Sequence, residues 1–424
     1  MATEVNYKTT RTYHFDVEIG DKNYTSEMTR FRMVTSLATS WQVFYLDLKL
    51  DPFDTILDGG FLGQNPIKIK AFFITEDEIQ QEYISFELMI IGGLNSKLTN
   101  KKSIGTSEDE KGAQPETILF NLIAVERDAF KKMTTMVNTV TDEGLTVEEI
   151  LDKLCKEVGL TLDTMDSTSI NKNKIPQVVI PPTTMQNAIY HIDESFGIYS
   201  GPTFAFCFTE DTESQNSVLY VMNLAAQLKK TEVMTLYQQA TDSEENDSLE
   251  QKTMDGDKFM VYKTIESNYS GNTKLGVLSK NMNFIIKPKD KLFKLIEKDL
   301  VKMCSDVGVI YENDQIEFDE NLSDRTRFFI DHPGNDDDET FIDSFIGKEI
   351  ANMTMIKVKL ARNLKIEHFL ELGSSVKLET KTAEYQGVGG RYVIFSTDMQ
   401  FVRNKEWSVT GTLNLIRTNK FSGQ

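Results

Sequence analysis

The sequence predicts a mainly β fold with α+β modules: two groups of strands, a small α/β module between them, and an inserted helical/β segment within the second group. From Arg11 to Glu126, apolar residues recur with a period of two, which is typical of strands that bury one face. After about Asp128, apolar residues recur at helical spacing in three segments, each ending at a glycine before an extended stretch. The 424 residues can form roughly two to four folding units.

The first part, residues 1–128, is expected to form a β-sandwich or barrel. Its strand candidates are "WQVFYLDLKL", "IKIKAFFIT", "YISFELMII" and "TILFNLIAV", which are dense in branched and aromatic residues. In the first candidate, four apolar side chains share one face: Phe44, Leu46, Leu48 and Leu50. The polar stretch "LNSKLTNKKSIGTSEDEKGAQPE" between the last two candidates predicts a long exposed loop.

Residues 129–225 are expected to form the α/β module. In "TVEEILDKLCKEVG", Thr146 and Glu149 have the spacing of a capping box, and Gly159 ends the predicted helix. A second helix is predicted in "TTMQNAIYHIDESFG", before Gly197, after the extended segment "QVVIPP". The stretch "FAFCFTEDTESQNSVLYVMNL" predicts a hairpin with a polar turn.

The remaining chain is divided by an acidic linker, residues 226–256, which contains "TDSEENDSLEQKTMDGD". Strands resume in residues 257–288 and 351–424, and residues 289–350 are expected to be an inserted α/β segment. Within this insertion, "KDKLFKLIEKDLVKMCSDVG" predicts a helix that ends at Gly308, and another helix is predicted near "TFIDSFIGKEIANMTM".

Composition and charge limit the classes of partner. The net charge of -19 makes the molecule repel nucleic acid and anionic lipid, although solubility alone is an equally good reason for such acidity. No signal-peptide pattern opens the chain, and no apolar run is long enough to span a membrane. Cys155, Cys207 and Cys304 lie too far apart for a CxxC metal site and suggest no disulfide framework, which indicates a reducing compartment.

No catalytic, cofactor-binding or metal-binding residue is assigned from the sequence. Phosphate loops, HExxH, GxSxG and EF-hand patterns are missing, and the "GVGGR" cluster predicts a turn. Trp41 and Trp407 are interpreted as core residues, and paired carboxylates of the glycosidase type stay open as an alternative. No histidine stands at metal-ligand spacing from another histidine or a cysteine; the four are His14, His191, His332 and His368. His332 lies in an acidic loop that could in principle hold a hard cation, but a solvated loop is the favoured interpretation. The acidic residues of this loop are Asp331, Asp336, Asp337 and Asp338.

Three segments near the C-terminus, "IANMTMIKVKLARNLKIEHFLELGSSVKLET", "GRYVIFSTDMQFV" and "EWSVTGTLNLIRTNK", resemble the end of the tail baseplate hub proteins of contractile-tailed bacteriophages. In that family a glycine step precedes a short strand, a strand of the "G.Yvi" type follows, and a last alternating strand closes a barrel, here residues 407–416. The residues that carry these two motifs are Leu372, Gly373, Val376, Leu378, Gly390, Tyr392, Val393 and Ile394. The order of barrel, α/β module and interrupted second barrel is also similar to that family.

The resemblance implies two tube-like β-barrel domains in each chain, and a homotrimer whose six barrels form a ring. Such a hub joins the hexameric tail tube to the trimeric tail spike in the virion, after assembly in the host cytoplasm. The implied partners are the spike protein and tail tube or tube-initiator proteins, with the tape measure protein as a further candidate; DNA passes through without specific binding. We further hypothesise that acidic residues line the channel and repel the DNA.

Two other functions stay open at this stage. One is another tail tube adaptor or terminator of a phage or contractile injection system, which is expected to have one barrel per chain where the hub has two. The other is a virion-associated peptidoglycan hydrolase that acts through paired carboxylates. The favoured interpretation is a structural protein without enzyme activity, cofactor or metal.

Overall fold

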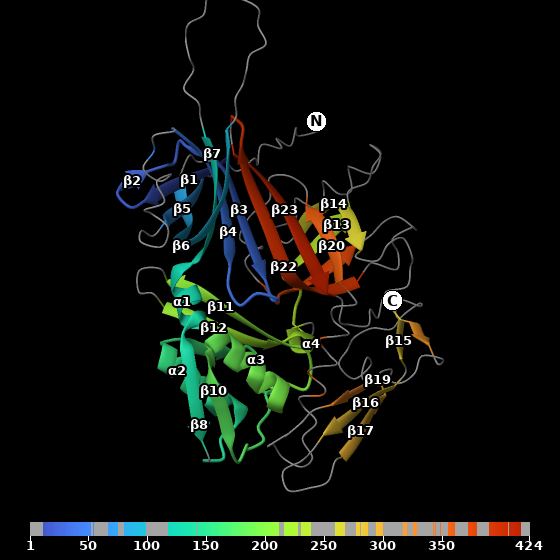
Figure 1. Ribbon diagram of the computed structural model, residues 1–424. Coiled ribbons are helices and arrows are strands. Elements are labelled where there is room, and N and C mark those ends of the chain that lie inside the picture. Colours follow the sequence, from blue (N-terminus) through green and yellow to red (C-terminus); the bar gives the residue numbers. More distant parts are fainter. Residues whose placement is uncertain are drawn as a thin grey trace, which may run out of the picture.

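The computed structural model shows a mainly β protein, with three helices of eight to twelve residues in its described part (Figure 1). The predicted combination of strands with α/β elements is therefore confirmed. The structure describes residues 12–51, 54, 67–74, 80–98, 118–141, 143–211, 216–227, 230–238, 259–267, 277–279, 281–286, 294–299, 317–319, 325–328, 342, 344, 348, 355–360, 372–379, 390–405 and 407–416.

One mixed sheet of thirteen strands runs through both predicted groups of strands. Its strands are β1 (Thr12–Ile19), β2 (Lys22–Asn23), β3 (Met28–Ser36), β4 (Val43–Leu50), β5 (Ile67–Ile74), β6 (Gln80–Leu98), β7 (Ile118–Glu126), β13 (Met234–Gln238), β14 (Phe259–Ser267), β20 (Met355–Leu360), β21 (Ser375–Glu379), β22 (Gly390–Arg403) and β23 (Trp407–Ile416). Their order is β2-β1-β5-β6-β7-β4-β3-β22-β21-β13-β14-β20-β23. The four predicted strands of the first part correspond to β4, β5, β6 and β7.

The hairpin β22–β23 joins the two groups of strands. The first residues of β22 pair with β21, whereas Ser396 to Val402 pair with β3. β22 also pairs with β23 along most of its length, and β23 pairs with β20. The pairings therefore lead from β22 through β21, β13, β14, β20 and β23 back to β22. In Figure 1 the red hairpin stands between the blue strands and the group that contains β13, β14 and β20.

Aromatic side chains fill the core behind the first group of strands. The ring of Phe15 on β1 lies 5.1 Å from that of Phe401 and 4.8 Å from that of Trp407, so β1 faces the hairpin across the core. Phe31 and Phe44 stack next to them with centroids 6.0 Å apart. These contacts bring strands from the two ends of the chain into one hydrophobic core.

The α/β module consists of α1 (Arg127–Thr134), β8 (Met136–Thr141), α2 (Val147–Val158), β9 (Thr161–Thr164), β10 (Val178–Thr184), α3 (Met185–Phe196), β11 (Thr203–Asp211), β12 (Asn216–Asn223) and the short α4 (Leu224–Gln227). The predicted capping box is confirmed, because the Thr146 side chain accepts from the amide of Glu149 and the Glu149 side chain accepts from the amide of Thr146. Gly159 ends α2 with a left-handed φ of 75°. The predicted second helix and the hairpin are also confirmed, as α3 and as β11–β12.

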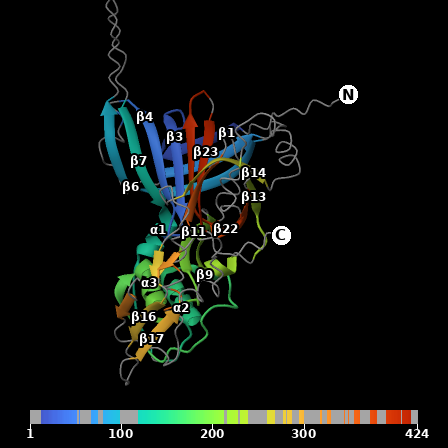
Figure 2. The ribbon, with the colours of Figure 1, turned by 90° about the vertical axis from the view of Figure 1, so that its right-hand side faces the viewer.

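The sheet β11-β12-β9 lies between two hydrophobic cores. Ala205 and Cys207 of β11 face a core built with the helices, whereas Phe206 faces the core of the large sheet. Phe204 adds an edge-to-face contact with Phe395 of β22, at 5.4 Å between centroids. The module is thus packed against one end of the large sheet, as the two perpendicular views show (Figures 1 and 2).

The inserted segment differs from its prediction. Instead of a helix, residues 294–299 form β17 (Lys294–Asp299), which pairs antiparallel with β16 (Asn281–Ile286). Its apolar residues fit helical spacing as well as a strand, so periodicity alone cannot separate the two, and pairing with the apolar β16 decides. β16 and β15 (Val277–Ser279) lie in residues 257–288, which were expected to belong to the second group of strands. They pair instead with strands of the insertion, β15 with β18 (Glu317–Asp319) and β16 with β17 and β19 (Arg325–Phe328), in sheets separate from the large one.

Four further predictions concern parts of the chain that are described only in part or not at all. The predicted helix near residue 345 is confirmed at Ile342, Ser344 and Lys348, which are helical. The predicted loop after β6 begins later than expected, since residues 94–98 continue the strand and pair with β7. The predicted linker, residues 226–256, is wrong at residues 234–238, which form β13 of the large sheet. Residues 239–256, the rest of the loop after β6 and the acidic loop around His332 lie outside the described residues.

Candidate functional site

One face of four neighbouring strands, β7, β4, β3 and β22, carries a connected set of half-buried polar side chains. On β3, β4, β23 and the second half of β22, buried residues alternate with half-buried ones, and the half-buried residues form the face opposite the core. The register aligns Val402, Arg30, Asp47 and Asn121 in one row across the strands, with Gln400 and Arg32 in the next row. We call the following six residues the polar face: Arg30, Arg32, Asp47, Asn121, Asp398 and Gln400.

Arg32 and Asp398 form the strongest pair on the polar face. Nε and Nη2 of Arg32 each donate to one carboxylate oxygen of Asp398, both at 2.7 Å. This two-point geometry is the most favourable one for an arginine and a carboxylate. It raises the pKa of the Arg32 guanidinium above its ordinary value, so the charge is permanent. The guanidinium also lies 5.1 Å from the ring centre of Tyr45.

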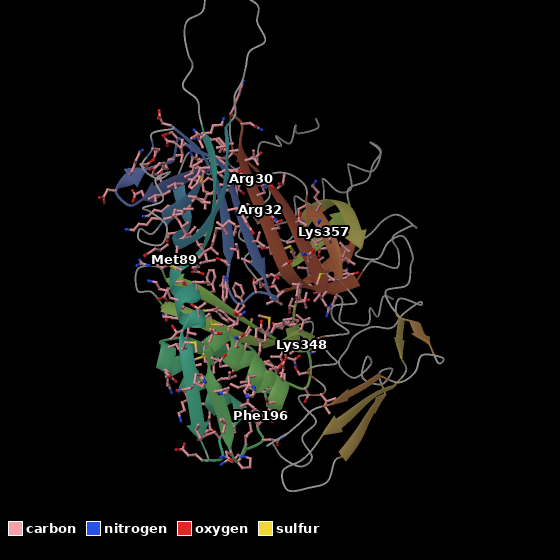
Figure 3. All side chains as sticks on the ribbon, viewed as in Figure 1. Arg30, Arg32, Met89, Phe196, Lys348 and Lys357 are labelled. Carbon is pink, nitrogen blue, oxygen red and sulfur yellow. The ribbon has the colours of Figure 1, made fainter. Side chains whose placement is uncertain are left out.

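Arg30 and Asp47 continue the network toward the next strands. Arg30 donates from Nη2 to Oε1 of Gln400 at 3.0 Å, and its Nη1 lies 3.8 Å from a carboxylate oxygen of Asp47. The other oxygen of Asp47 accepts from the side-chain amide of Asn121 at 2.5 Å. Two arginines thus face two aspartates, and the polar face has no net charge. Figure 3 labels Arg30 and Arg32 on β3.

Histidines and acidic residues do not gather into a reactive site in the described residues. His14 is exposed on β1 and His191 is half-buried on α3. Within the described ranges, no group of three or more His, Cys, Asp or Glu side chains is placed to hold a metal ion. His332, His368 and the aspartates near His332 lie outside those ranges. The assignment of no catalytic, cofactor or metal residue therefore stays a prediction.

The described thiols lie in a hydrophobic core, and the two tryptophans, which are partly buried, pack against the cores. Cys155 and Cys207 are free and buried, and burial raises the pKa of Cys155 to about 12 and that of Cys207 well above its ordinary value. Both are therefore neutral, unreactive thiols near pH 7. Trp407 contacts Phe15, and Trp41 contacts Phe130 at 5.0 Å between ring centres, as the core interpretation expected.

Three buried carboxylates of the described residues were missed in the sequence: Asp54, Glu126 and Asp193. Glu126 lies at the junction of β7 and α1, and Asp193 lies on the inner face of α3. Asp193 accepts from the Ser344 hydroxyl at 3.1 Å and forms an ion pair with Lys348. Asp193 could have been noticed in the sequence, because it lies four residues after Ile189, at a position that the helical pattern assigns to the apolar face. Glu126 had no such signal, because it follows a strand pattern without a helix-start motif.

The fold matches solved structures of tail proteins, although the sequence matches no protein-family model and no curated protein. A tail protein from Neisseria meningitidis has a TM-score of 0.52 at 12% identity, over 96% of this chain and 97% of that one. The 43 kDa tail protein of prophage MuSo2 from Shewanella oneidensis has a TM-score of 0.53 at 10% identity, over 95% of this chain and 98% of that one. The chain has the tail-protein fold. The resemblance that the C-terminal motifs indicated is confirmed at the level of the fold.

A weaker match is the c3393 protein of E. coli, a component of the type VI secretion system with structural similarity to the T4 bacteriophage tail proteins gp27 and gp5. Its TM-score is 0.46 at 8% identity, over 95% of this chain and 75% of that one.

No helix in the described part of this chain is long and apolar enough to cross a membrane.

Proposed function

We propose that this protein is a structural component of a bacteriophage tail: the central baseplate hub that links the hexameric tail tube to the trimeric tail spike. The observation that carries the proposal is the arrangement of two groups of strands around one shared hairpin. The pairings of the second group return to their starting strand β22, which supports a tube-like barrel there. In the first group, β1 faces the same hairpin across an aromatic core, which supports a second barrel.

In this proposal the domains follow the division that the sequence suggested. Residues 1–128 form the first barrel. Residues 257–288 and 351–424 supply the second barrel, with β13 from the predicted linker added, and the module and the insertion connect the two. The hairpin contributes strands to both barrels, because β22 pairs with β3 as well as with β21. Three chains with two barrels each supply six similar units, which is the number that a hexameric tube requires.

The polar face is proposed to line the DNA channel. Its charged side chains are neutralised by partners within the same chain, so a passing polyanion meets no net positive field. DNA would therefore move past it without specific binding. The hypothesis of an acidic wall finds no support on this face, where two arginines balance two aspartates. Other acidic residues would have to supply any repulsion.

The partners and location follow from the same proposal. The spike protein and the tail tube or tube-initiator proteins would bind the two ends of the trimer, with the tape measure protein as a further candidate, and the protein would reside in the virion baseplate. A role as a tube adaptor or terminator is the alternative within tail proteins. The match to structural tail proteins supports a role without catalysis.

The native mass of the purified chain, measured by light scattering over a range of concentrations, tests the proposal. A trimer of the 48.3 kDa chain, seen as a ring of six units by electron microscopy, is the expected result, with or without added spike protein. A hexamer would favour the adaptor or terminator. A zymogram on peptidoglycan tests the enzyme alternative, and clear lysis by the pure protein would contradict a purely structural role.

A further inference from the structure

Glu126 occupies the point where the large sheet passes into the α/β module. It ends β7 and is the N-cap of α1, and its side chain is only 2% exposed. Its Oε1 accepts a hydrogen bond from the amide of Thr209 on β11 at 3.0 Å. Its Oε2 is fully buried and has no hydrogen-bond partner among the described residues. Ionising the carboxyl group in such a place costs free energy, because one oxygen loses its hydrogen bonds to water and gains no hydrogen bond from the protein in their place.

The groups around Glu126 do not neutralise it. On α1, Asp128 adds a second negative charge, and the nearby cation, Lys132, is paired with Asp128 at 2.6 Å. On β12, the Ser217 hydroxyl donates to Asp128 at 2.5 Å and lies 2.9 Å from the Thr209 hydroxyl.

The remaining ionisable groups near this cluster add no positive charge for the carboxylate. Cys207 of β11 and Cys155 of α2 are buried thiols that stay neutral at physiological pH. Glu87 of β6 and Arg127 of α1 are paired with each other. A proton is therefore the simplest partner for the buried Oε2.

We propose that Glu126 makes the junction between the large sheet and the α/β module a proton-dependent joint, which is closed when the carboxyl group is protonated and loosened when it is ionised. Because Glu126 ends β7 of the sheet and its carboxyl group binds Thr209 on β11 of the module, loss of this contact would loosen the module against the sheet. The proposal depends on this geometry alone and does not require the protein to be a hub.

The direction of the pH effect follows from the burial of Glu126. Burial raises the pKa of this carboxyl group from its ordinary value of 4.5 to about 7. A group whose pKa is raised by folding stabilises the folded junction. This stabilisation is fully present when the pH is below the pKa of the unfolded state, and it is lost as the pH rises through the pKa of the folded state. The joint is thus expected to be tight at pH 5 and loosened above about pH 8, one unit beyond the pKa.

Trp41 offers a local reporter, because its ring contacts Phe130 on α1. The chain has two tryptophans, so a Trp407→Phe background leaves Trp41 as the single emitter. In this background the Trp41 emission should change with pH, with a midpoint near 7. Glu126→Gln, which is neutral at every pH, should remove the change. Glu194→Gln, at an exposed position on α3, should leave it in place.

Hydrogen exchange on the otherwise natural chain gives a second readout that does not depend on the tryptophan variant. The Thr209 amide should lose protection above pH 7 relative to its intrinsic exchange rate, and Glu126→Gln should keep it protected. His191→Gln is the control for the imidazole on α3. The proposal is overturned if Glu126→Gln shows the same transition, if the natural chain shows none, or if His191→Gln alone removes it.

Discussion

At the scale of single residues, the pairing of Arg32 with Asp398 ties β3 to the C-terminal hairpin. Both side chains are about one-third exposed, so water screens the pair, while the two-point geometry strengthens it. A double-mutant cycle with Arg32→Gln and Asp398→Asn is expected to give a coupling free energy of about 1 kcal/mol in chemical unfolding. The more exposed pair Lys156 and Asp152 on α2 is the matched control and should give about 0.3 kcal/mol. Equal coupling in the two pairs would contradict a special role for the two-point contact.

Gly373 is a second residue with a clear structural requirement. Its φ is +79°, and an added Cβ would lie 2.6 Å from the sulfur of Met222. Gly373→Ala is therefore expected to lower the free energy of unfolding by about 1 to 2 kcal/mol, mainly through the left-handed backbone. Gly92→Ala is the control, since nothing lies within 4 Å of its added Cβ. A loss of the same size at both positions would show that backbone strain at residue 373 is not the cause.

These two sites differ in how far the sequence could predict them. Gly373 belongs to a local motif, so its importance was visible within a few residues. Arg32 and Asp398 are 366 residues apart, and strand alternation says only that each lies on the polar side. The polar face could therefore be predicted as exposed, but its partners could not. Nothing local distinguishes a paired arginine from a solvated one.

At the scale of secondary-structure elements, Asp193 holds the helical segment near residue 345 against α3. Asp193 is buried. It forms an ion pair with the ammonium group of Lys348 and accepts hydrogen bonds from the Ser344 hydroxyl. Lys348→Met should cost about 2 to 3 kcal/mol in chemical unfolding, because it leaves a buried carboxylate without its cation. Lys377→Met, which removes a partner of Glu379 that is about one-third exposed, should cost less than about 0.5 kcal/mol. If Lys348→Met is equally mild, the pair contributes little to docking the segment.

The elements that were predicted correctly carry several local signals that agree. Helix α2 has a capping box, an amphipathic face and a terminal glycine, and all three place it between the same residues. The segment that contains residues 294–299 has apolar periodicity and a glycine at residue 308, but no cap at its start, and pairing with the apolar β16 selects the strand. Three agreeing local signals therefore determined α2, whereas pairing with the preceding strand determined β17.

At the scale of the whole molecule, the sequence indicated the order of the parts but not the strand exchange between them. Alternation in residues 390–416 predicted two strands, and it carried no information on which neighbours they would choose. The structure places them beside β3, β20 and β21 together. The predicted domain boundary at residue 128 therefore excludes the hairpin of residues 390–416 from the first domain, although this hairpin pairs with β3 and completes the first group of strands.

A chain that ends at residue 389 is therefore expected to lose both groups of strands, not only the second. Its β3 and β21 would lack a neighbour, and Phe15 would lose its contacts with Phe401 and Trp407. The expected result is a weak near-ultraviolet circular dichroism signal and no cooperative thermal transition.

A chain that ends at residue 416 is the control, because it is also shortened at the C-terminus but keeps the hairpin. A permuted chain, with residues 390–416 joined ahead of residue 12 by a flexible linker, should recover both signals, because β1 already faces the hairpin. Cooperative unfolding of the chain that ends at residue 389 would show that the first group of strands folds without the hairpin.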